Sequence, residues 1–127
     1  MDNYKITEEI FKKIEDSWNN GSGEGFGSLF TEDADFVDIR GDLHKSRTEI
    51  SKGHEAILNS IYKGSKVNYK IERVKEISDG VLLAHVSAEL NAPSGPLAGI
   101  NNSLISALIL KQGSDYLITA FHNTLKR

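Results

Sequence analysis

Residues 67–125 read VNYKIERVKEISDGVLLAHVSAELNAPSGPLAGINNSLISALILKQGSDYLITAFHNTL, and this stretch decides the fold. It contains four runs rich in β-branched and other apolar residues, at 67–77, 81–90, 100–111 and 116–125. Short segments with glycine, serine, aspartate or proline separate the runs, which is typical of turns. None of these segments is long enough for a crossover helix, so the spacing predicts four antiparallel strands.

The part of the chain before these strands has the periodicity of helices. Apolar residues that recur every fourth position predict a helix over residues 7–18, with Thr7 as its cap. A second helix is predicted over residues 49–62, with Thr48 as its cap. Helices followed by long strands predict an α+β fold, in a single domain that spans residues 1–127.

Composition and charge exclude several classes of protein. The 127 residues include 15 basic and 18 acidic ones, and no basic patch of the kind that binds nucleic acid is visible. The absence of cysteine excludes disulfides, thiolate metal sites and cysteine nucleophiles. The N-terminus has no apolar stretch, and the apolar-rich residues 104–110 are too few to span a bilayer. We therefore expect a cytoplasmic protein with no nucleic-acid or membrane partner.

A glycine-rich segment, Gly21-Ser-Gly-Glu-Gly-Phe-Gly27, invites comparison with phosphate-binding loops. The pattern Gly-x-Gly-x-x-Gly cannot be drawn through it, because Phe26 and Ser28 fall where the third glycine is needed. No strand precedes the segment, and no Gly-Lys-Ser/Thr follows it. The sequence instead predicts a turn before a short helix that ends at Phe30.

Several segments together carry a resemblance to a known family. They are Trp18-Asn-Asn-Gly21, Leu29–Asp38, Gly41, Arg47–Ile50, His54, Ile57, Gly113–Ile118 and His122–Thr124. In this order and spacing the chain resembles the NTF2-like superfamily, in particular its SnoaL-like and SgcJ-like branch with the related DUF4440 domains. The match covers nearly the whole chain, although no single motif decides it.

The resemblance implies a cone-shaped fold with N-terminal helices packed on a strongly curved antiparallel sheet. It also implies a deep pocket for a small organic molecule and a homodimer formed through the sheet. Known members include ketosteroid isomerases, polyketide cyclases, epoxide hydrolases and dehydratases, so the fold alone does not define a function. No nicotinamide or flavin fingerprint is visible, and we expect no cofactor.

Asp38 is the first candidate catalytic residue. Residues 33–41 align without gaps with the ketosteroid isomerase segment that holds the general base, and a carboxylate in an apolar pocket can move a proton beside a carbonyl. The resemblance places that family's oxyanion donors at Ile14 and Ala107, where this chain has none, which argues against ketosteroid isomerase activity. Strand alternation leaves a surface carboxylate as the alternative interpretation of Asp38.

His122 is the second candidate catalytic residue. Tyr116, Ile118, Ala120 and His122 share one face of a regular strand, so His122 reaches the pocket if Tyr116 and Ile118 pack inward. A histidine there could act as a general acid or base, and a hydrogen-bonded structural histidine is the alternative. Asn123 lies on the opposite face in this register, and we predict a structural role for it.

Five further residues are predicted to line the pocket, because they are aromatic or lie on the apolar side of a helix. They are Trp18, Phe30, Phe36, His54 and Tyr62. Core packing is the alternative for the aromatic residues, and a pocket with such walls favours flat, ring-containing ligands. No metal site is predicted, because the histidines are scattered and Leu58 stands where a zinc motif beginning at His54 needs its second histidine.

Three functions are compatible with these residues. The first is a cofactor-independent enzyme that isomerises, cyclises or dehydrates a small ring-containing carbonyl compound, with Asp38 as the base and His122 as the acid or electrostatic partner. The second is a non-catalytic protein that binds or carries a small hydrophobic molecule. The third is a dimerisation module without a ligand. The first requires that Asp38 and His122 face one cavity.

Overall fold

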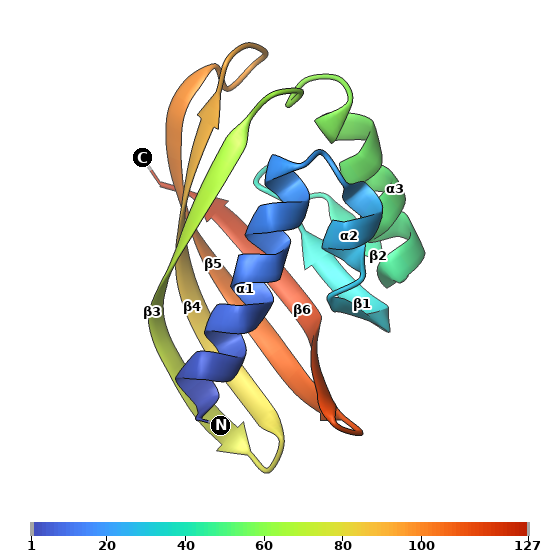
Figure 1. Cartoon of the computed structure of the whole chain (residues 1–127), viewed down its shortest axis with the longest axis vertical. Helices are drawn as coiled ribbons and strands as arrows, with labels where there is room; N and C mark the ends of the chain where they lie inside the picture. The colour runs from blue at the N-terminus through green and yellow to red at the C-terminus, as the bar shows by residue number, and fades with distance from the viewer. Residues whose placement is uncertain (1, 127) are drawn as a thin grey trace.

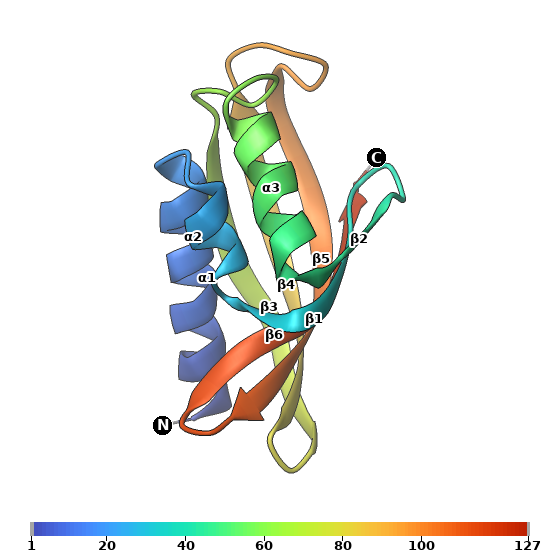
Figure 2. The same ribbon diagram turned by 90° about the vertical axis from the view of Figure 1, so that its right-hand side faces the viewer.

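The computed structural model describes residues 2–126 and shows helices packed on the concave side of one curved, six-stranded sheet (Figures 1 and 2). The elements in chain order are α1 (Asn3–Asn19), α2 (Gly23–Gly27), β1 (Phe30–Val37), β2 (Leu43–Lys45), α3 (Ser46–Leu58), β3 (Lys66–Ser78), β4 (Val81–Ala92), β5 (Gly99–Gln112) and β6 (Asp115–Leu125). The predicted α+β arrangement, with N-terminal helices on a strongly curved sheet, is therefore confirmed.

The strands follow the order β2-β1-β6-β5-β4-β3 across the sheet. The long strands β3 to β6 are sequential antiparallel neighbours, as their short connections predict. The strand β1 pairs in parallel with β6, with Phe36 beside Phe121, and the short strand β2 forms a hairpin with β1. The sheet is thus antiparallel except at the pairing of β1 with β6.

Two helices begin earlier than predicted, α1 after Asp2 and α3 after Lys45, so neither Thr7 nor Thr48 is a cap. The side chain of Asp2 caps α1 by accepting from the backbone amide of Lys5 at 2.8 Å, whereas Lys45 makes no side-chain cap bond and the hydroxyl of Ser46, inside the first turn of α3, accepts from the amide of Glu49 at 3.2 Å. Thr7 is instead buried inside α1, where its hydroxyl donates to a backbone carbonyl one turn earlier. Within residues 2–126, no helix combines the length and the apolarity needed to cross a bilayer.

One hydrophobic core lies between the helices and the inner face of the sheet. Its phenylalanine rings pack against one another, with Phe36 stacked on Phe121 at a centroid distance of 4.5 Å and Phe26 stacked on Phe30 at 5.7 Å. Stacked and edge-to-face aromatic pairs add to the free energy that burial of the rings provides. The aromatic core holds α2 and β1 against β6. The position of the candidate site depends on this packing.

Side chains of α1 occupy part of the edge of β3. Asn19 donates to the backbone carbonyl of Val67 at 3.2 Å and accepts from the amide of the same residue at 2.8 Å. Glu15 accepts from the backbone amide of Tyr69 at 3.0 Å. Inside a sheet, a neighbouring strand would form hydrogen bonds to these backbone groups. At the edge of this sheet, side chains of α1 satisfy them instead.

A β-bulge interrupts the alternation of side chains in β6. Leu108 of β5 pairs with Ala120, while the next residue, Ile109, pairs with Ile118, so Thr119 is an extra residue without a partner in β5. The Thr119 hydroxyl accepts a hydrogen bond from the hydroxyl of Thr31 at 3.1 Å. An extra residue shifts every following side chain to the opposite face of the strand.

Candidate functional site

A cavity of about 270 Å³ lies at one end of the sheet, between its inner face and α3. Its walls come from the end of α1, the β1–β2 turn, α3 and the following loop, the β4–β5 loop, and strands β1 and β3 to β6. The lining residues are Trp18, Phe36, Asp38, Ile39, Arg40, His54, Ile57, Ile61, Tyr62, Val67, Tyr69, Ala88, Leu90, Pro96, Leu97, Asn101, Ser103, Asn123 and Leu125. Most of these side chains are aromatic or aliphatic, and a few polar groups lie among them.

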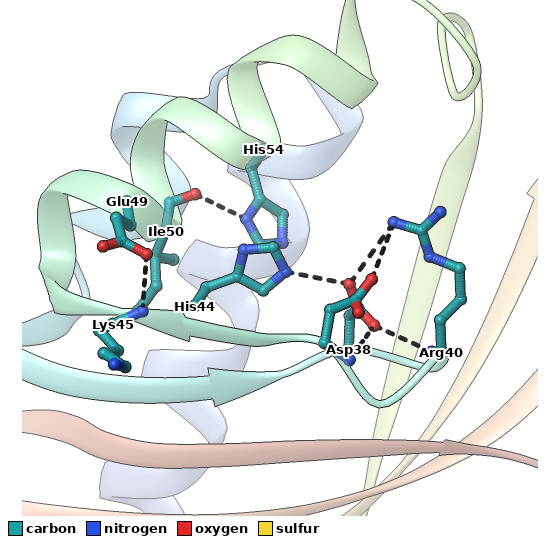
Figure 3. A network of polar contacts seen from close by, with 8 residues as sticks. Asp38, Arg40, His44, Lys45, Glu49, Ile50 and His54 are labelled. Carbon is teal, nitrogen blue, oxygen red and sulfur yellow. Dashed lines mark hydrogen bonds and ion pairs between the residues drawn. The ribbon is translucent and has the colours of Figure 1, made fainter.

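Asp38 directly follows β1 in the β1–β2 turn, where its carboxylate is the centre of a network of polar contacts (Figure 3). It is one of the residues that line the cavity. Its Oδ1 accepts hydrogen bonds from the backbone amides of Arg40 and Asp42, at 2.9 and 3.1 Å. Its Oδ2 accepts from Nε2 of His44 at 3.0 Å. Burial raises the pKa of Asp38, but these hydrogen bonds outweigh it, so the net pKa is below its ordinary value. The group is therefore a stabilised carboxylate.

The pairing of His44 with Asp38 was not predicted from the sequence, which suggested only that His44 lies near a turn. The hairpin places His44 opposite Phe36 and brings its ring back over the β1–β2 turn. The tight spacing of Asp38 and His44 around a Gly-Asp turn is the signal that could have indicated it. His44 is not among the lining residues, so it acts on the site by fixing the carboxylate.

His54 lies on the inner side of α3 and is almost completely buried. Its ring stacks on Phe26 at a centroid distance of 3.9 Å and meets the edge of Phe36 at 4.9 Å. Nδ1 lies 2.8 Å from the backbone carbonyl of Ile50, which can only accept, so Nδ1 carries the proton and donates it. Burial lowers the pKa of His54 to about 4, and the ring is therefore neutral near pH 7.

Trp18 and Tyr62 form the wall of the cavity where α1 meets the loop after α3. Their rings are 5.6 Å apart, and the indole N–H of Trp18 donates to the hydroxyl of Ser65 at 2.9 Å. That hydroxyl donates in turn to the backbone carbonyl of Tyr62 at 2.6 Å. This chain of hydrogen bonds fixes both aromatic faces against the cavity.

The structure corrects the prediction that His122 faces the pocket. His122 is exposed and absent from the lining of the cavity, whereas Asn123 lies in it. Tyr116 and Ile118 do lie on the inner side, but the bulge at Thr119 reverses the alternation after them. Asp38 and His122 therefore do not share a cavity, and the acid–base pair predicted from the sequence does not form.

The structure also corrects the prediction that Phe30 lines the pocket. Phe30 is fully buried in the core, where its ring contacts those of Phe26, Phe36 and Phe121 at centroid distances of 5.7 to 6.0 Å. Phe36 lies between this cluster and the cavity, so it alone of β1's two phenylalanines reaches the lining. For Phe30, core packing was the correct interpretation.

Ile14 and Ala107, where the resemblance implies the oxyanion donors of ketosteroid isomerases, are both buried members of the core. Two tyrosines lie in the lining instead. Burial raises the pKa of Tyr69 and that of Tyr62, so both phenols are protonated near neutral pH. Among residues 2–126, no group of three histidine or acidic side chains is placed to hold a metal ion.

Comparison with known proteins supports the fold. No family model matches the sequence, and no curated protein sequence matches it. A domain of unknown function with a cystatin-like fold from Nostoc punctiforme PCC 73102 is 25% identical, with a TM-score of 0.88 over 98% of this chain and 78% of that chain.

Two further solved structures extend this comparison. An NTF-2-like protein of unknown function from Shewanella oneidensis MR-1 is 15% identical, with a TM-score of 0.81 over 95% of this chain and 98% of that one. A candidate scytalone dehydratase from Novosphingobium aromaticivorans DSM 12444 is 13% identical, with a TM-score of 0.82 over 98% and 84%. The chain therefore has the cystatin-like, NTF2-like α+β fold that its sequence implied.

Proposed function

We propose that this chain is a small-molecule pocket protein of the SnoaL-like kind, which binds a compact, flat and mostly apolar molecule. The observation that carries the proposal is the cavity of about 270 Å³ between α3 and the sheet. Concave sites with apolar and aromatic walls and a few polar groups are the usual binding sites for small organic molecules. The rings of Trp18, Phe36 and Tyr62 favour a ligand that contains rings.

The first test uses two-ring aromatic probes, 2-naphthol and 2-methoxynaphthalene, with binding measured by calorimetry and by the shift in melting temperature. We expect both probes to bind and to raise the melting temperature, because a ligand that binds only the folded state stabilises it. Ala88 lies in the lining on β4, and Ala88→Leu fills part of the cavity. This variant should weaken the binding of both probes by about tenfold or more.

Ala120→Leu is the matched control, because Ala120 lies on β6 outside the cavity lining and its neighbour in β5 is Leu108. It adds the same atoms to the sheet without entering the cavity, so it should leave both affinities unchanged. A protein that binds neither probe, or an Ala88→Leu variant that binds both as well as the original chain, would contradict the proposal.

A second candidate is the cofactor-independent acid–base enzyme, which is favoured by one observation. The carboxylate of Asp38 is fixed by three hydrogen bonds at the edge of a cavity that also contains the neutral ring of His54. The low pKa of Asp38 makes it a weak base, and His122, the acid–base partner predicted from the sequence, lies outside the cavity. Binding without catalysis therefore agrees better with the geometry.

The enzyme candidate is tested by the exchange of α-hydrogens of 2-tetralone in deuterium oxide, followed by NMR. A general base in the cavity would accelerate this exchange, and Asp38→Asn would reduce the acceleration by about a hundredfold or more. Asp42→Asn is the matched control, since Asp42 is an exposed carboxylate in the same turn. We expect the protein not to accelerate the exchange relative to buffer alone. An accelerated exchange that is lost in Asp38→Asn and kept in Asp42→Asn would favour the enzyme.

A further inference from the structure

The cavity opens to solvent where its rim is mostly apolar. The exposed members of its lining mark this opening, and they are Arg40, Ile61 and Pro96. Ile61 lies in the α3–β3 loop and is 41% exposed, and Pro96 belongs to the β4–β5 loop. The half-buried Leu97 follows Pro96 and is also part of the lining. Two of the three exposed lining residues are therefore apolar, at a place where water surrounds an empty cavity.

The apolar residues form one continuous rim because their two loops meet. The α3–β3 and β4–β5 loops lie side by side at the same end of the sheet in both views (Figures 1 and 2). Gly95 packs so closely on the other loop that a Cβ added to it would lie 2.6 Å from the carbonyl oxygen of Ile61. Single exposed apolar residues are common, but an apolar surface that continues a pocket extends its binding site. We call Ile61, Pro96 and Leu97 the apolar rim.

The interior of the cavity has the opposite character, because its buried walls carry polar groups without protein partners. His54 and Ser103 are only 6% and 8% exposed, yet within residues 2–126 neither Nε2 of His54 nor the Ser103 hydroxyl has a protein partner. Both remain accessible, since only Oδ1 of Asn123 lacks both a partner and accessible surface. The hydroxyls of Tyr62 and Tyr69 also lie in the lining. Hydroxyls donate or accept, so these walls suit a polar ring substituent.

The size of the cavity directs any longer ligand outward. Its volume of about 270 Å³ is smaller than that of most ligand pockets, which span roughly 300–1,000 Å³. The interior therefore holds a compact ring but not a ring together with a long chain. The β1–β2 turn, on another side of the cavity, contributes the charged residues Asp38 and Arg40, and the Arg40 side chain is 75% exposed. An apolar chain that leaves the cavity is thus covered best along the apolar rim.

Given the proposed binding function, we propose that the ligand is a ring compound with a polar substituent at its inner end and an apolar chain at its outer end, and that the chain lies over the apolar rim. The ring fills the interior, with its polar substituent at His54 and Ser103. The chain removes Ile61, Pro96 and Leu97 from water. Because the free energy of covering apolar surface grows with the covered area, affinity should continue to rise with chain length after the interior is full.

The test measures the binding of 4-alkylphenols with ethyl, butyl and hexyl chains by calorimetry. Full burial of a methylene group is worth about a fourfold gain in affinity, and a chain on a rim is only partly covered. Each added methylene should therefore tighten binding to the unmodified chain about twofold. In total, 4-hexylphenol should bind about tenfold or more tightly than 4-ethylphenol.

A double variant shows where the chain lies. Ile61→Ser combined with Leu97→Ser makes the rim polar and leaves the buried walls of the cavity unchanged. This variant should bind 4-ethylphenol as the unmodified chain does, but its gain from ethyl to hexyl should fall to about threefold or less. Ile77→Ser is the matched control, because Ile77 is 52% exposed near the other end of β3 and outside the lining. It should keep the full gain.

The outcomes separate this inference from the function on which it rests. Failure of 2-naphthol and of all three alkylphenols to bind would overturn the proposed function and the inference with it. Equal affinities of 4-ethylphenol and 4-hexylphenol for the unmodified chain would overturn only the inference, because the cavity would still bind rings. This comparison does not depend on whether the double variant folds. A gain with chain length that survives in a folded double variant would place the chain elsewhere and would also overturn the inference.

Discussion

Gly23→Ala should lower the free energy of unfolding by about 3 kcal/mol. This value is at the upper end of the usual cost of overpacking, because the added methyl group meets a rigid backbone. A Cβ at Gly23 would lie 2.6 Å from both Cα of Glu55 and the carbonyl oxygen of Ser51, which belong to the backbone of α3. A helix backbone cannot move aside as a flexible side chain can, so α2 and α3 must separate. Unfolding in urea or guanidinium chloride, followed by circular dichroism, measures the loss.

Gly53→Ala is the matched control for this prediction. Gly53 is a glycine inside α3, and a Cβ there would contact only the ring of His44, at 3.7 Å or more. Alanine is favoured over glycine in a helix by about 0.5–1 kcal/mol, so this variant should be slightly more stable than the original chain. A Gly23→Ala variant as stable as Gly53→Ala would show that α2 does not pack on α3 as described.

These contacts also explain the glycine-rich segment. Gly23 and Gly27 both lie against α3, close to Ser51, and Gly25 faces Ser17 of α1. Alternate glycines are therefore the places where a five-residue helix approaches two longer helices. The segment serves helix packing, in agreement with the absence of a phosphate-loop pattern in its sequence.

The second large effect concerns pH. Between pH 7 and pH 4 we expect the free energy of unfolding to fall by about 3 kcal/mol through His54 alone, because its pKa of about 4 in the folded chain lies below the ordinary value of 6.5. The unfolded chain binds the proton more readily in this range, so stability rises with pH and is lost as the pH falls. Nearby, His44 lowers and Asp38 raises the pKa of His54, so these two influences oppose each other.

Denaturant titrations at a series of pH values test this prediction. His54→Phe keeps a flat ring against Phe26 but cannot titrate, so its stability should change much less between pH 7 and pH 4. The exposed His122, changed to Gln, is the control for the general effect of losing a histidine. An unchanged pH dependence in His54→Phe would mean that another group controls acid stability.

Much of the fold could be predicted, because local patterns determine it. The apolar stripe of α1 and the alternating runs of β3 to β6 appear in the structure within a few residues of their expected limits. The helix starts were less accurate, because Asp2 rather than Thr7 caps α1 and because α3 begins after Lys45, which has no side chain typical of a cap. The parallel pairing of β1 with β6 joins segments that are distant in sequence, and no local pattern indicates it.

The site was predicted only in part. Trp18, Phe36, Asp38, His54 and Tyr62 lie in the cavity lining, and their roles in binding stay predictions. Phe30 was misplaced because an aromatic residue on a buried strand has the same pattern in a core and in a pocket wall. The pairing of Asp38 with His44 depends on the geometry of one hairpin. The homodimer, the cytoplasmic location and the SnoaL-like or SgcJ-like branch also stay predictions.

The unpaired residue in β6 has a consequence for how this fold can acquire new chemistry. Each residue from Ala120 to Leu125 has the β5 partner that it would keep if Thr119 were absent, so deletion of Thr119 would remove the bulge and leave Asn123 inward and His122 outward. Pairing of Thr119 with Leu108 in a regular strand would instead move each following residue by one position and place His122 beside the buried Ile105. A slip of one residue at the bulge thus exchanges an amide for an imidazole at the cavity wall without any change in the sequence.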